Sequence, residues 1–442
     1  IRGKLVTGVQ TCALPISQAD ESQSSVLTFA SLTRTGNGTL DFVGSGLGVD
    51  SRNKVMFTSP PASGLIGLWA TYNSTNFAAY DSVNGVVAAD DSFFTDIPAR
   101  GPFAISDDAT LNARITSDGV SGPLALAGTT TSQIRTLQQQ SGQASEVGMT
   151  NQTLLVSEIL IAPGKSGLTL GTEPEEGLVM PLAANGTLTL FNSSDSTLTL
   201  NASVTNNSGN SSVAKFGAGA VVLNGRNSYT GSTLIDEGSL EFGGASAQKL
   251  SGVISGKGSL IKSGTNLLHL TAANTYSGPT YINSGTVRPN DNATFGTTAS
   301  GVFIADGATL DVGCTPDVGG TRPKEGLYLQ TEPITVEGSG ANGAGVIVNV
   351  STASQMNAIG KLSLSGDATF GGTQRWDIRN YPVSFNDHTF TKTGVNEIAI
   401  IAANVNPGAG HIAVNQGLLR FETTMSVNGS PANTITVQAN AT

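Results

Sequence analysis

Residues 215–240 read KFGAGAVVLNGRNSYTGSTLIDEGSL, and residues 262–287 read KSGTNLLHLTAANTYSGPTYINSGTV. The two stretches align without a gap at an offset of 47 residues, the distance from Lys215 to Lys262. Lys, Gly, Leu, Asn, Tyr, Gly, Thr, Ile and Gly hold their places in both copies. A fixed period of this length marks a repeat architecture, in which each unit buries its apolar face only against its neighbours.

Within each copy, apolar residues alternate with small polar ones, as at Val221 and Leu223 in the first copy and Leu268, Leu270 and Ile282 in the second. A period of two is that of a β-strand and not of a helix. Gly and Asn tolerate tight corners, and they end each apolar run. The pattern therefore predicts a β-solenoid in which Leu223, Leu270 and Ile282 point inward.

The motif resembles the autotransporter-associated β-strand repeat, also called the passenger-associated transport repeat. Residues 215–241 fit that pattern nearly throughout, residues 262–288 carry Asn266 and Ala272 in place of two glycines, and a looser copy at 392–420 lacks the Tyr. The resemblance implies an all-β chain folded as an elongated, right-handed parallel β-helix. It also implies export to the cell surface, at the bacterial outer membrane, or release outside the cell.

The N-terminal segment needs separate treatment. Residues 6–16 resemble the peptide obtained by translating sequencing-adapter DNA, so residues 1–17 are expected to be non-native and do not enter the fold prediction. Short β-rich runs between Gly, Ser, Asn and Pro continue beyond them, and no Pro-rich or Ser-rich linker interrupts the chain. We expect one continuous passenger-like solenoid over residues 18–442, as a fragment open at both ends.

Composition excludes several classes of protein. The formal net charge is −10 and Lys and Arg are scattered singly, which argues against nucleic-acid binding. The recurring strand alternation, with 38% apolar residues, argues against disorder. Without a run of 18 apolar residues, the chain offers no membrane-spanning helix. Cys12 and Cys314 are expected to stay unpaired, because a solenoid holds distant coils apart.

Gly338, Gly340 and Gly343 match the Gly-x-Gly-x-x-Gly dinucleotide fingerprint. That fingerprint needs a following helix whose N-terminus faces the pyrophosphate. Val346–Val350 follows instead and is typical of a strand, so the sequence predicts a glycine corner. No cofactor is expected.

Adjacent carboxylates occur at Asp90-Asp91, at Asp107-Asp108 and at Glu175-Glu176. Pectin-type hydrolases built on β-helices use paired carboxylates as acid and base. Neighbours in a strand point to opposite faces, however, so an adjacent pair is not by itself a pair in space. We interpret these residues as solvated loop charges.

Other residue types also allow a functional and a structural interpretation. His269, His388 and His411 have no second His or Cys nearby in sequence, and no metal site is expected. The repeated pairs Asn227/Asn274 and Tyr229/Tyr276 fit a sugar-binding stripe, but packing in register between coils is favoured, as it is for Trp376.

The sequence thus predicts a structural or adhesive passenger segment of a large bacterial surface or secreted protein, without catalytic, cofactor-binding or metal-binding residues. Expected partners are extracellular polysaccharide or other cell surfaces, with no nucleic acid and with the membrane reached only through an anchor outside this chain. Two alternatives stay open. A polysaccharide lyase or glycoside hydrolase would need carboxylates that converge in one groove, alone or with Lys and Arg. A passive carbohydrate-binding surface would need ordered rows of exposed Tyr or Trp.

Overall fold

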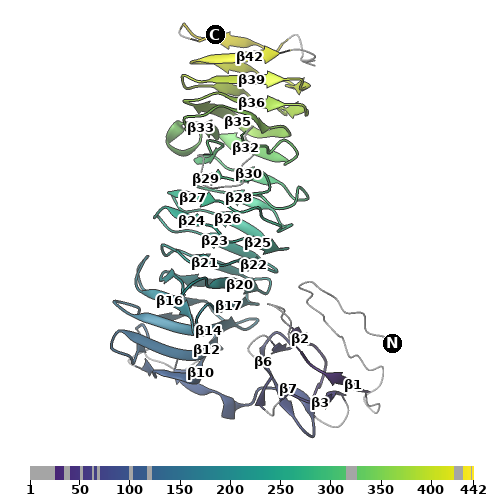
Figure 1. Cartoon of the computed structure of the whole chain (residues 1–442), viewed down its shortest axis with the longest axis vertical. Helices are drawn as coiled ribbons and strands as arrows, with labels where there is room; N and C mark the ends of the chain where they lie inside the picture. The colour runs from purple at the N-terminus through teal and green to yellow at the C-terminus, as the bar shows by residue number, and fades with distance from the viewer. Residues whose placement is uncertain are drawn as a thin grey trace. The chain divides into compact units, whose positions relative to one another are not determined.

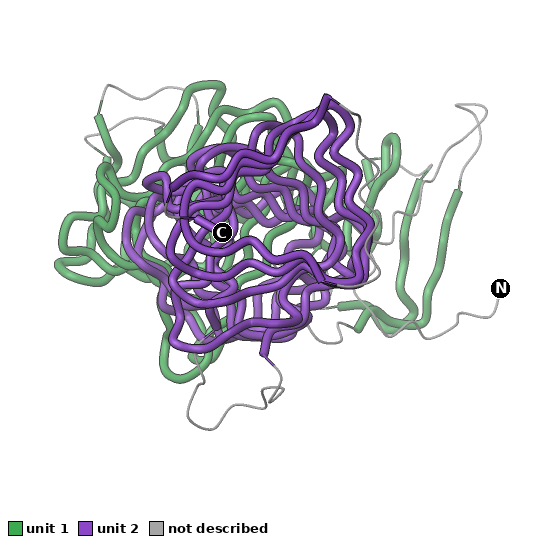
Figure 2. Tube along the Cα trace, turned by 90° about the horizontal axis from the view of Figure 1, so that it is seen from above, with its two compact units in different colours: residues 1–221 green, residues 222–442 purple. Residues whose placement is uncertain are grey.

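The structure is a computed structural model. It describes residues 25–33, 40–49, 53–61, 64–66, 70–98, 103–116, 122–314, 326–422, 432–439 and 441–442. The adapter-like segment and Cys12 lie outside these ranges. The chain divides into two compact units, residues 1–221 and 222–442, which are green and purple in Figure 2.

The described residues are all-β, as predicted. They form strands, turns and two three-residue 3-10 segments, and none of them lies in an α-helix. Within these ranges, no helix is long and apolar enough to cross a membrane.

The first unit contains stacked parallel strands that repeat once per coil. Ser132 pairs with Leu154 and Leu154 with Val179, so one coil takes 22 to 25 residues here. Inward residues such as Ile134 and Val156 are buried. The first sheet contains β8 (Thr95–Pro98), β10 (Asp108–Thr116), β12 (Thr131–Gln139), β14 (Thr153–Ile161), β17 (Thr187–Asn192) and β20 (Ser212–Phe216). The same sheet also contains β16 (Leu178–Pro181), which pairs with β14, and β19 (Ser203–Val204), which pairs with β16. A second sheet contains β13 (Ser145–Val147), β15 (Leu168–Leu170) and β18 (Leu198–Leu200).

The start of the first unit is built differently. Strands β4 (Gly64–Leu65), β5 (Ala70–Tyr72), β6 (Asn76–Asp81) and β7 (Gly85–Ala88) pair antiparallel, because tight turns join β5 to β6 and β6 to β7. Parallel pairs add β1 (Ser25–Ser31) to β3 (Asn53–Ser59), β2 (Leu40–Phe42) to β5, and β9 (Ala104–Ile105) to β11 (Ala125–Leu126). A local core of Phe42, Val55, Tyr72, Tyr80 and Val86 joins β2, β3, β5, β6 and β7.

The second unit is a stack of parallel coils with two long strand columns and further strands in two other sheets. In Figure 1 these strands lie above one another from β23 to β42. Strand β35 (Leu362–Gly372) is long enough to take part in two columns. The first column contains β23 (Ser239–Phe242), β26 (Ser259–Lys262), β28 (Thr280–Ile282), β30 (Val302–Ile304), β32 (Ile334–Gly338), β35, β37 (Val383–Ser384) and β40 (Val405–Asn406).

The second column contains β24 (Gln248–Leu250), β27 (Leu267–Leu270), β29 (Gly285–Pro289), β31 (Ala308–Asp311), β33 (Ile347–Asn349), the end of β35, β38 (Phe390–Lys392), β41 (Ile412–Val414) and β43 (Ile435–Val437). Of the remaining strands, β22 (Thr233–Ile235) pairs with β25 (Ile254–Gly256). A separate sheet contains β34 (Gln355–Ile359), β36 (Trp376–Arg379), β39 (Glu397–Ile401) and β42 (Leu418–Glu422). Strand β21 (Ala220–Leu223) falls at the division between the units.

The predicted strand register is confirmed. Leu223, Leu270 and Ile282 are all buried, with at most 1% of each residue exposed. Along the first column, Phe242 pairs with Lys262 and Lys262 with Ile282, so successive coils contribute to one inward row. A slip of one residue would have exchanged the inner and outer faces.

The 47-residue repeat does not stack on itself. Leu240 pairs with Leu260 and Leu260 with Thr280, so one coil takes 20 residues in this region and the repeat exceeds two coils. As a result, β22 pairs with β25, whereas its counterpart in the second copy, β28, lies in the first column between β26 and β30. Equivalent residues of the two copies therefore lie on different faces of the second unit.

Candidate functional site

The repeated Asn and Tyr residues are interior groups. Tyr229 and Tyr276 are almost fully buried, and each hydroxyl bonds a threonine hydroxyl four residues on, Thr233 at 2.9 Å and Thr280 at 2.6 Å. Burial raises the pKa of Tyr229 to about 12, so that phenol stays neutral. These rings are buried and not available to a sugar, so the predicted packing in the interior is confirmed, whereas the predicted register between like residues is not.

The packing differs from the expected stacks of like residues. Asn227 donates to Gln248 Oε1 at 3.0 Å, while Asn274 accepts from the Ile254 amide at 2.8 Å and donates to the Thr294 carbonyl at 2.6 Å. Each asparagine thus ties its coil to neighbouring coils through unlike partners. The reason is the mismatch between repeat length and coil length, which keeps equivalent residues apart.

The lysine that opens each copy is also buried. Lys215, Lys262 and Lys392 are at most 4% exposed, although lysine is among the residues least often found inside proteins. Each ammonium group donates to the carbonyl of the glycine two residues on, at Gly217, Gly264 and Gly394. The Lys-x-Gly motif is therefore a side chain folded back on its own corner.

Burial lowers the pKa of both Lys262 and Lys392 to about 8. Lys392 Nζ lies 2.6 Å from the Thr393 carbonyl, 2.7 Å from that of Gly394 and 3.0 Å from that of Gln416 in the next coil. Three carbonyl oxygens satisfy the three donors of an ammonium group. The arrangement is a coil-to-coil clamp, and it leaves no amine free for nucleophilic chemistry.

Trp376 is fully buried and donates its indole N–H to the Gly371 carbonyl at 2.9 Å, so it packs in the interior as predicted. Its neighbours form an ion-pair network on the outer side of β36, β39 and β42. Asp377 has a fully buried side chain and bonds Arg375 at 2.9 Å and Arg379 at 2.5 Å. Further pairs join Arg375 to Glu397 at 3.1 Å, Arg420 to Glu397 at 3.2 Å and Arg420 to Glu422 at 2.8 Å.

This network brings three carboxylates and three arginines together, which is the kind of cluster that a polysaccharide-active enzyme would require. Its chemistry points away from general acid catalysis. The hydrogen bond from Arg420 lowers the pKa of Glu422, and every carboxylate has an arginine within 3.2 Å. A catalytic acid needs a pKa raised toward neutrality. The arrangement pairs each carboxylate with an arginine and favours a structural ion-pair network over a catalytic acid.

The adjacent carboxylates, interpreted from the sequence as solvated loop charges, bind within their own loop or to a more distant strand, and the members of each aspartate pair have different partners. Asp90 caps the 3-10 segment Asp91–Phe93 by accepting from the Ser92 amide at 2.8 Å, and Asp91 pairs with Arg114 at 2.7 Å. In the next pair, Asp107 and Asp108 accept from different backbone amides, those of Gln133 and Thr110.

Glu176 accepts hydrogen bonds from both backbone amides and side-chain hydroxyls. It accepts from the backbone amides of Met149 at 3.0 Å, Thr172 at 2.5 Å and Glu173 at 3.0 Å, and from the hydroxyls of Thr150 and Thr172. Partial burial raises its pKa, but these hydrogen bonds outweigh burial and lower it to about 2. It locks the 172–176 turn and is ionised at any physiological pH.

Glu332 is the exception, because burial, partly offset by Lys361, raises its pKa to about 7. Its side chain is buried, and its Oε1 has no hydrogen-bond partner among the described residues. The contacts of the described residues place no second carboxylate beside Glu332 to act as base. A lone interior carboxyl does not make an acid–base pair.

The remaining sequence signals also have structural explanations. Gly338, Gly340 and Gly343 have positive φ angles of 89°, 78° and 71° and form a corner that ends in a three-residue 3-10 segment. A strand, β33, follows instead of a helix, as predicted. His388 Nδ1 lies 3.9 Å from Asp367, and His411 accepts from the Thr434 amide. Within the described ranges, no three His, Cys, Asp or Glu residues are placed to hold a metal.

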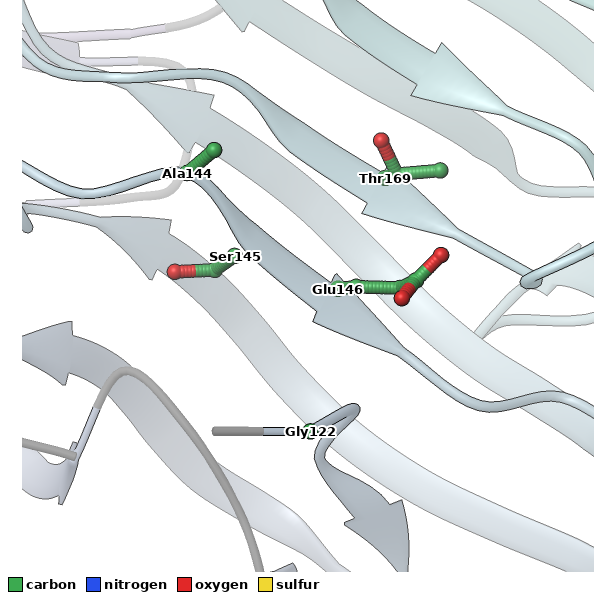
Figure 3. A pocket seen from close by; sticks show the side chains of 5 residues that line it. All are labelled: Gly122, Ala144, Ser145, Glu146 and Thr169. Atoms are coloured by element: carbon green, nitrogen blue, oxygen red, sulfur yellow. The ribbon is translucent and has the colours of Figure 1, made fainter. Parts of the chain in front are cut away.

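A hollow of about 310 Å³ lies in the first unit. Figure 3 shows Glu146 and Thr169 beside each other on neighbouring strands, where they are register partners. The hollow is also lined by Gly122, Ala144 and Ser145, and the Ser145 hydroxyl is bonded to Gln139. One carboxylate without a basic or acidic partner among these lining residues offers no catalytic pair.

One surface feature was not foreseen. Tyr281 and Phe303 are 36% and 38% exposed on adjacent strands, and their rings stack at a centroid distance of 5.3 Å and an angle of 22°. The counterpart of Tyr281 in the first copy is Leu234, which is buried, and Phe303 lies beyond the second copy. Only the coil length of 22 residues reveals that the two rings meet.

Comparison with known proteins identifies the repeats. Residues 213–242 and 260–288 match the family model of the passenger-associated-transport-repeat, which confirms the resemblance seen in the motif. The chain is also similar to the Adhesin BmaC autotransporter of Brucella suis biovar 1 (strain 1330), with 31% identity over 220 residues. That alignment covers 48% of this chain and 6% of the adhesin, so the chain matches only a small part of this relative. No solved structure matches the chain.

Proposed function

We propose that this chain, which carries two passenger-associated-transport repeats, is a structural or adhesive passenger segment that acts at the bacterial cell surface or after release from it. One observation carries the proposal: the matched residues 213–242 and 260–288 form strands of stacked parallel coils whose polar repeat residues face inward. Such a repeat maintains a scaffold and leaves the outer positions free to vary.

The physical design suits display. Each interior strand of a parallel stack is hydrogen-bonded on both sides, which protects its edges from other chains. Lys262, Lys392 and Asn274 add bonds between coils that do not depend on a large apolar core. Persistence outside the cell requires this kind of distributed stability more than it requires a pocket. Similarity to an adhesin adds support for an adhesive role.

The test is to display the chain on a non-adherent bacterium by fusion to an outer-membrane translocator domain. We expect the segment to be accessible to antibody on intact cells and to increase attachment to host-cell or polysaccharide-coated surfaces. Cells that display the translocator alone are the control. A segment that stays inside the cell would contradict the proposal. A segment that is displayed without increasing attachment to any surface would reject the adhesive role and leave the structural one.

A polysaccharide-active enzyme is the second candidate, because the Arg375–Asp377–Glu397 network does gather opposite charges on one face. The test is to incubate the chain with acidic and neutral polysaccharides and to follow reducing ends and unsaturated products. Turnover that disappears in Asp377→Asn, or in the Asn variants of Asp90, Asp91, Asp107 or Asp108, would establish this candidate. Absence of turnover in every substrate would reject it.

A further inference from the structure

The outward residues of the first column of the second unit form a continuous row, here called the outer stripe. Each member pairs in register with the next, along strands that can be followed through β23, β26, β28, β30 and β32 in Figure 1. In order, the outer stripe contains Glu241, Ile261, Tyr281, Phe303, Thr335, Ser363, Ser384 and Asn406.

The centre of the outer stripe is aromatic and rigid. Tyr281 and Phe303 each lie between two buried neighbours on their strands, so the backbone under both rings is fixed by the core. The rings stack at 5.3 Å, and each still leaves more than a third of its residue exposed. A flat, exposed, pre-ordered ring pair loses little conformational entropy when it binds a ligand.

Polar groups flank the rings. Asn283 is exposed and directly follows the end of β28, two residues after Tyr281, and Thr335 follows Phe303 in the stripe. Further along, the hydroxyls of Ser363 and Ser384 bond the Asn386 amide and are already partnered. The polar side chains next to the rings are thus an amide and a hydroxyl, and the carboxylates of Glu241 and Glu337 lie farther along the same face.

We propose that the outer stripe binds a neutral glycan chain, with sugar rings stacked on Tyr281 and Phe303 and sugar hydroxyls bonded by Asn283 and Thr335. A pyranose ring presents an apolar C–H face together with hydroxyl edges, which matches an aromatic centre with amide and hydroxyl flanks. Successive coils advance by ~4.8 Å, close to the advance of one sugar unit in an extended chain. The glycan therefore runs along the coil axis. This inference rests on the proposed adhesive role and names its ligand.

Charge selects a neutral ligand over an acidic one. Glu241 stands at one end of the aromatic segment, and Glu337 lies two residues from Thr335 on the same side of β32. The whole chain carries a formal charge of −10. A uronic acid or sulfated chain would bring more negative charge to this surface, and like charges in an interface are unfavourable.

The size of the apolar patch argues against a protein partner. Stable protein interfaces bury about 800 Å² per partner, with an apolar centre several residues wide. Ile261, Tyr281 and Phe303 follow one another along the coil axis, one residue per coil, and only Tyr281 and Phe303 of the three are large exposed apolar residues. A narrow polymer fits such a strip better than a second copy of this chain does.

The test is calorimetric titration of the purified chain with hexasaccharides of glucose and mannose, and with a hexamer of galacturonic acid. We expect a neutral hexamer to bind and the acidic hexamer to bind more weakly. Tyr281→Ala and Phe303→Ala should each weaken binding roughly three- to tenfold, the range expected for one aromatic contact. Tyr328→Ala is the matched control, because Tyr328 is an exposed aromatic residue outside the stripe. Circular dichroism should show all variants folded.

Several outcomes would overturn the inference: no binding of either neutral hexamer, tighter binding of the acidic hexamer, or equal binding by wild type and the Tyr281→Ala/Phe303→Ala double variant. Self-association that the double variant abolishes would assign the stripe to a second copy. Attachment of displayed cells separates the two proposals. If cells that display the double variant attach as well as cells that display the wild type, the glycan-binding role of the outer stripe is refuted and the adhesive role of the chain stands. If wild type is not displayed, the adhesive role fails, and titration still tests the stripe.

Discussion

The closing glycine of the second repeat offers a quantitative test of coil packing. Gly285 has a φ of 69°, and a Cβ added there would lie 2.3 Å from the Gly264 carbonyl oxygen and 2.7 Å from the Thr265 carbonyl carbon. Both contacts involve the backbone of the preceding coil, which cannot move without disturbing its own hydrogen bonds. Gly285→Ala should therefore strain its own backbone and also push two coils apart.

Gly307 provides a matched control. Its φ is 78°, yet no heavy atom lies within 4 Å of an added Cβ. An L-residue at positive φ costs about 1–2 kcal/mol at either site. Overpacking adds about 1–3 kcal/mol at Gly285 alone. We expect Gly285→Ala to lower the free energy of unfolding by about 2–5 kcal/mol and Gly307→Ala by about 1–2 kcal/mol.

The assay is urea unfolding followed by far-ultraviolet circular dichroism and tryptophan fluorescence, with both midpoint and slope compared among the three proteins. The slope matters because repeat arrays can lose cooperativity, and a changed slope would prevent a direct comparison of free energies. Equal destabilisation by the two substitutions would refute the close approach of coils at Gly285. So would a larger effect at Gly307.

Three further predictions follow from the interior. Ile282→Ala should lower the free energy of unfolding by about 2–5 kcal/mol, whereas Asn283→Ala should lower it by under about 0.5 kcal/mol. The reason is that Ile282 is buried and its neighbour Asn283 is exposed. Similar losses for the two variants in denaturant melts would refute the strand register. Tyr276→Phe should cost about 1–2 kcal/mol by leaving buried Thr280 without its partner, whereas exposed Tyr281→Phe should be neutral in the same melts. The free energy of unfolding should rise from pH 8 toward pH 10. In the folded chain Lys262 and Lys392 have pKa values of about 8, against an ordinary 10.5. The unfolded chain therefore binds more protons than the folded chain in this pH range, so raising the pH favours folding. Denaturant melts of the Lys262→Met/Lys392→Met variant should show a smaller rise, and an unchanged rise would exclude these two groups as its cause.

The repeat and its strand register could be predicted from the sequence, because both depend on residues that are close together in the chain. Period-two alternation distinguishes Ile282 from Asn283, and Gly and Asn mark the corners, so the inward residues could be assigned without a structure. The Lys-x-Gly pair at Lys262 also recurs in sequence, but burial of an ammonium group runs against the ordinary preference of lysine. The sequence signal for this burial was the position of the lysine two residues before a corner glycine.

Contacts between coils could not be predicted, because they depend on coil lengths that the loops set. Tyr281 meets Phe303, and Glu397 meets Arg375 and Arg420, across separations of about one coil. The 47-residue repeat is longer than two coils, so it gives a misleading spacing for such contacts. The antiparallel strands β4 to β7 follow from two tight turns that the parallel resemblance gave no reason to expect.

Disulfide cross-linking along the outer stripe tests the coil register most directly. In a background with Cys12 and Cys314 replaced by Ala, neighbouring outward positions should have Cα atoms ~4.8 Å apart, within the range that a disulfide spans. The account predicts rapid, near-complete cross-linking in Ile261→Cys/Tyr281→Cys and in Tyr281→Cys/Phe303→Cys. It predicts no cross-link in Ile261→Cys/Phe303→Cys, two coils apart. A cross-link in that last pair, or none in the first two, would contradict stacked coils in this register.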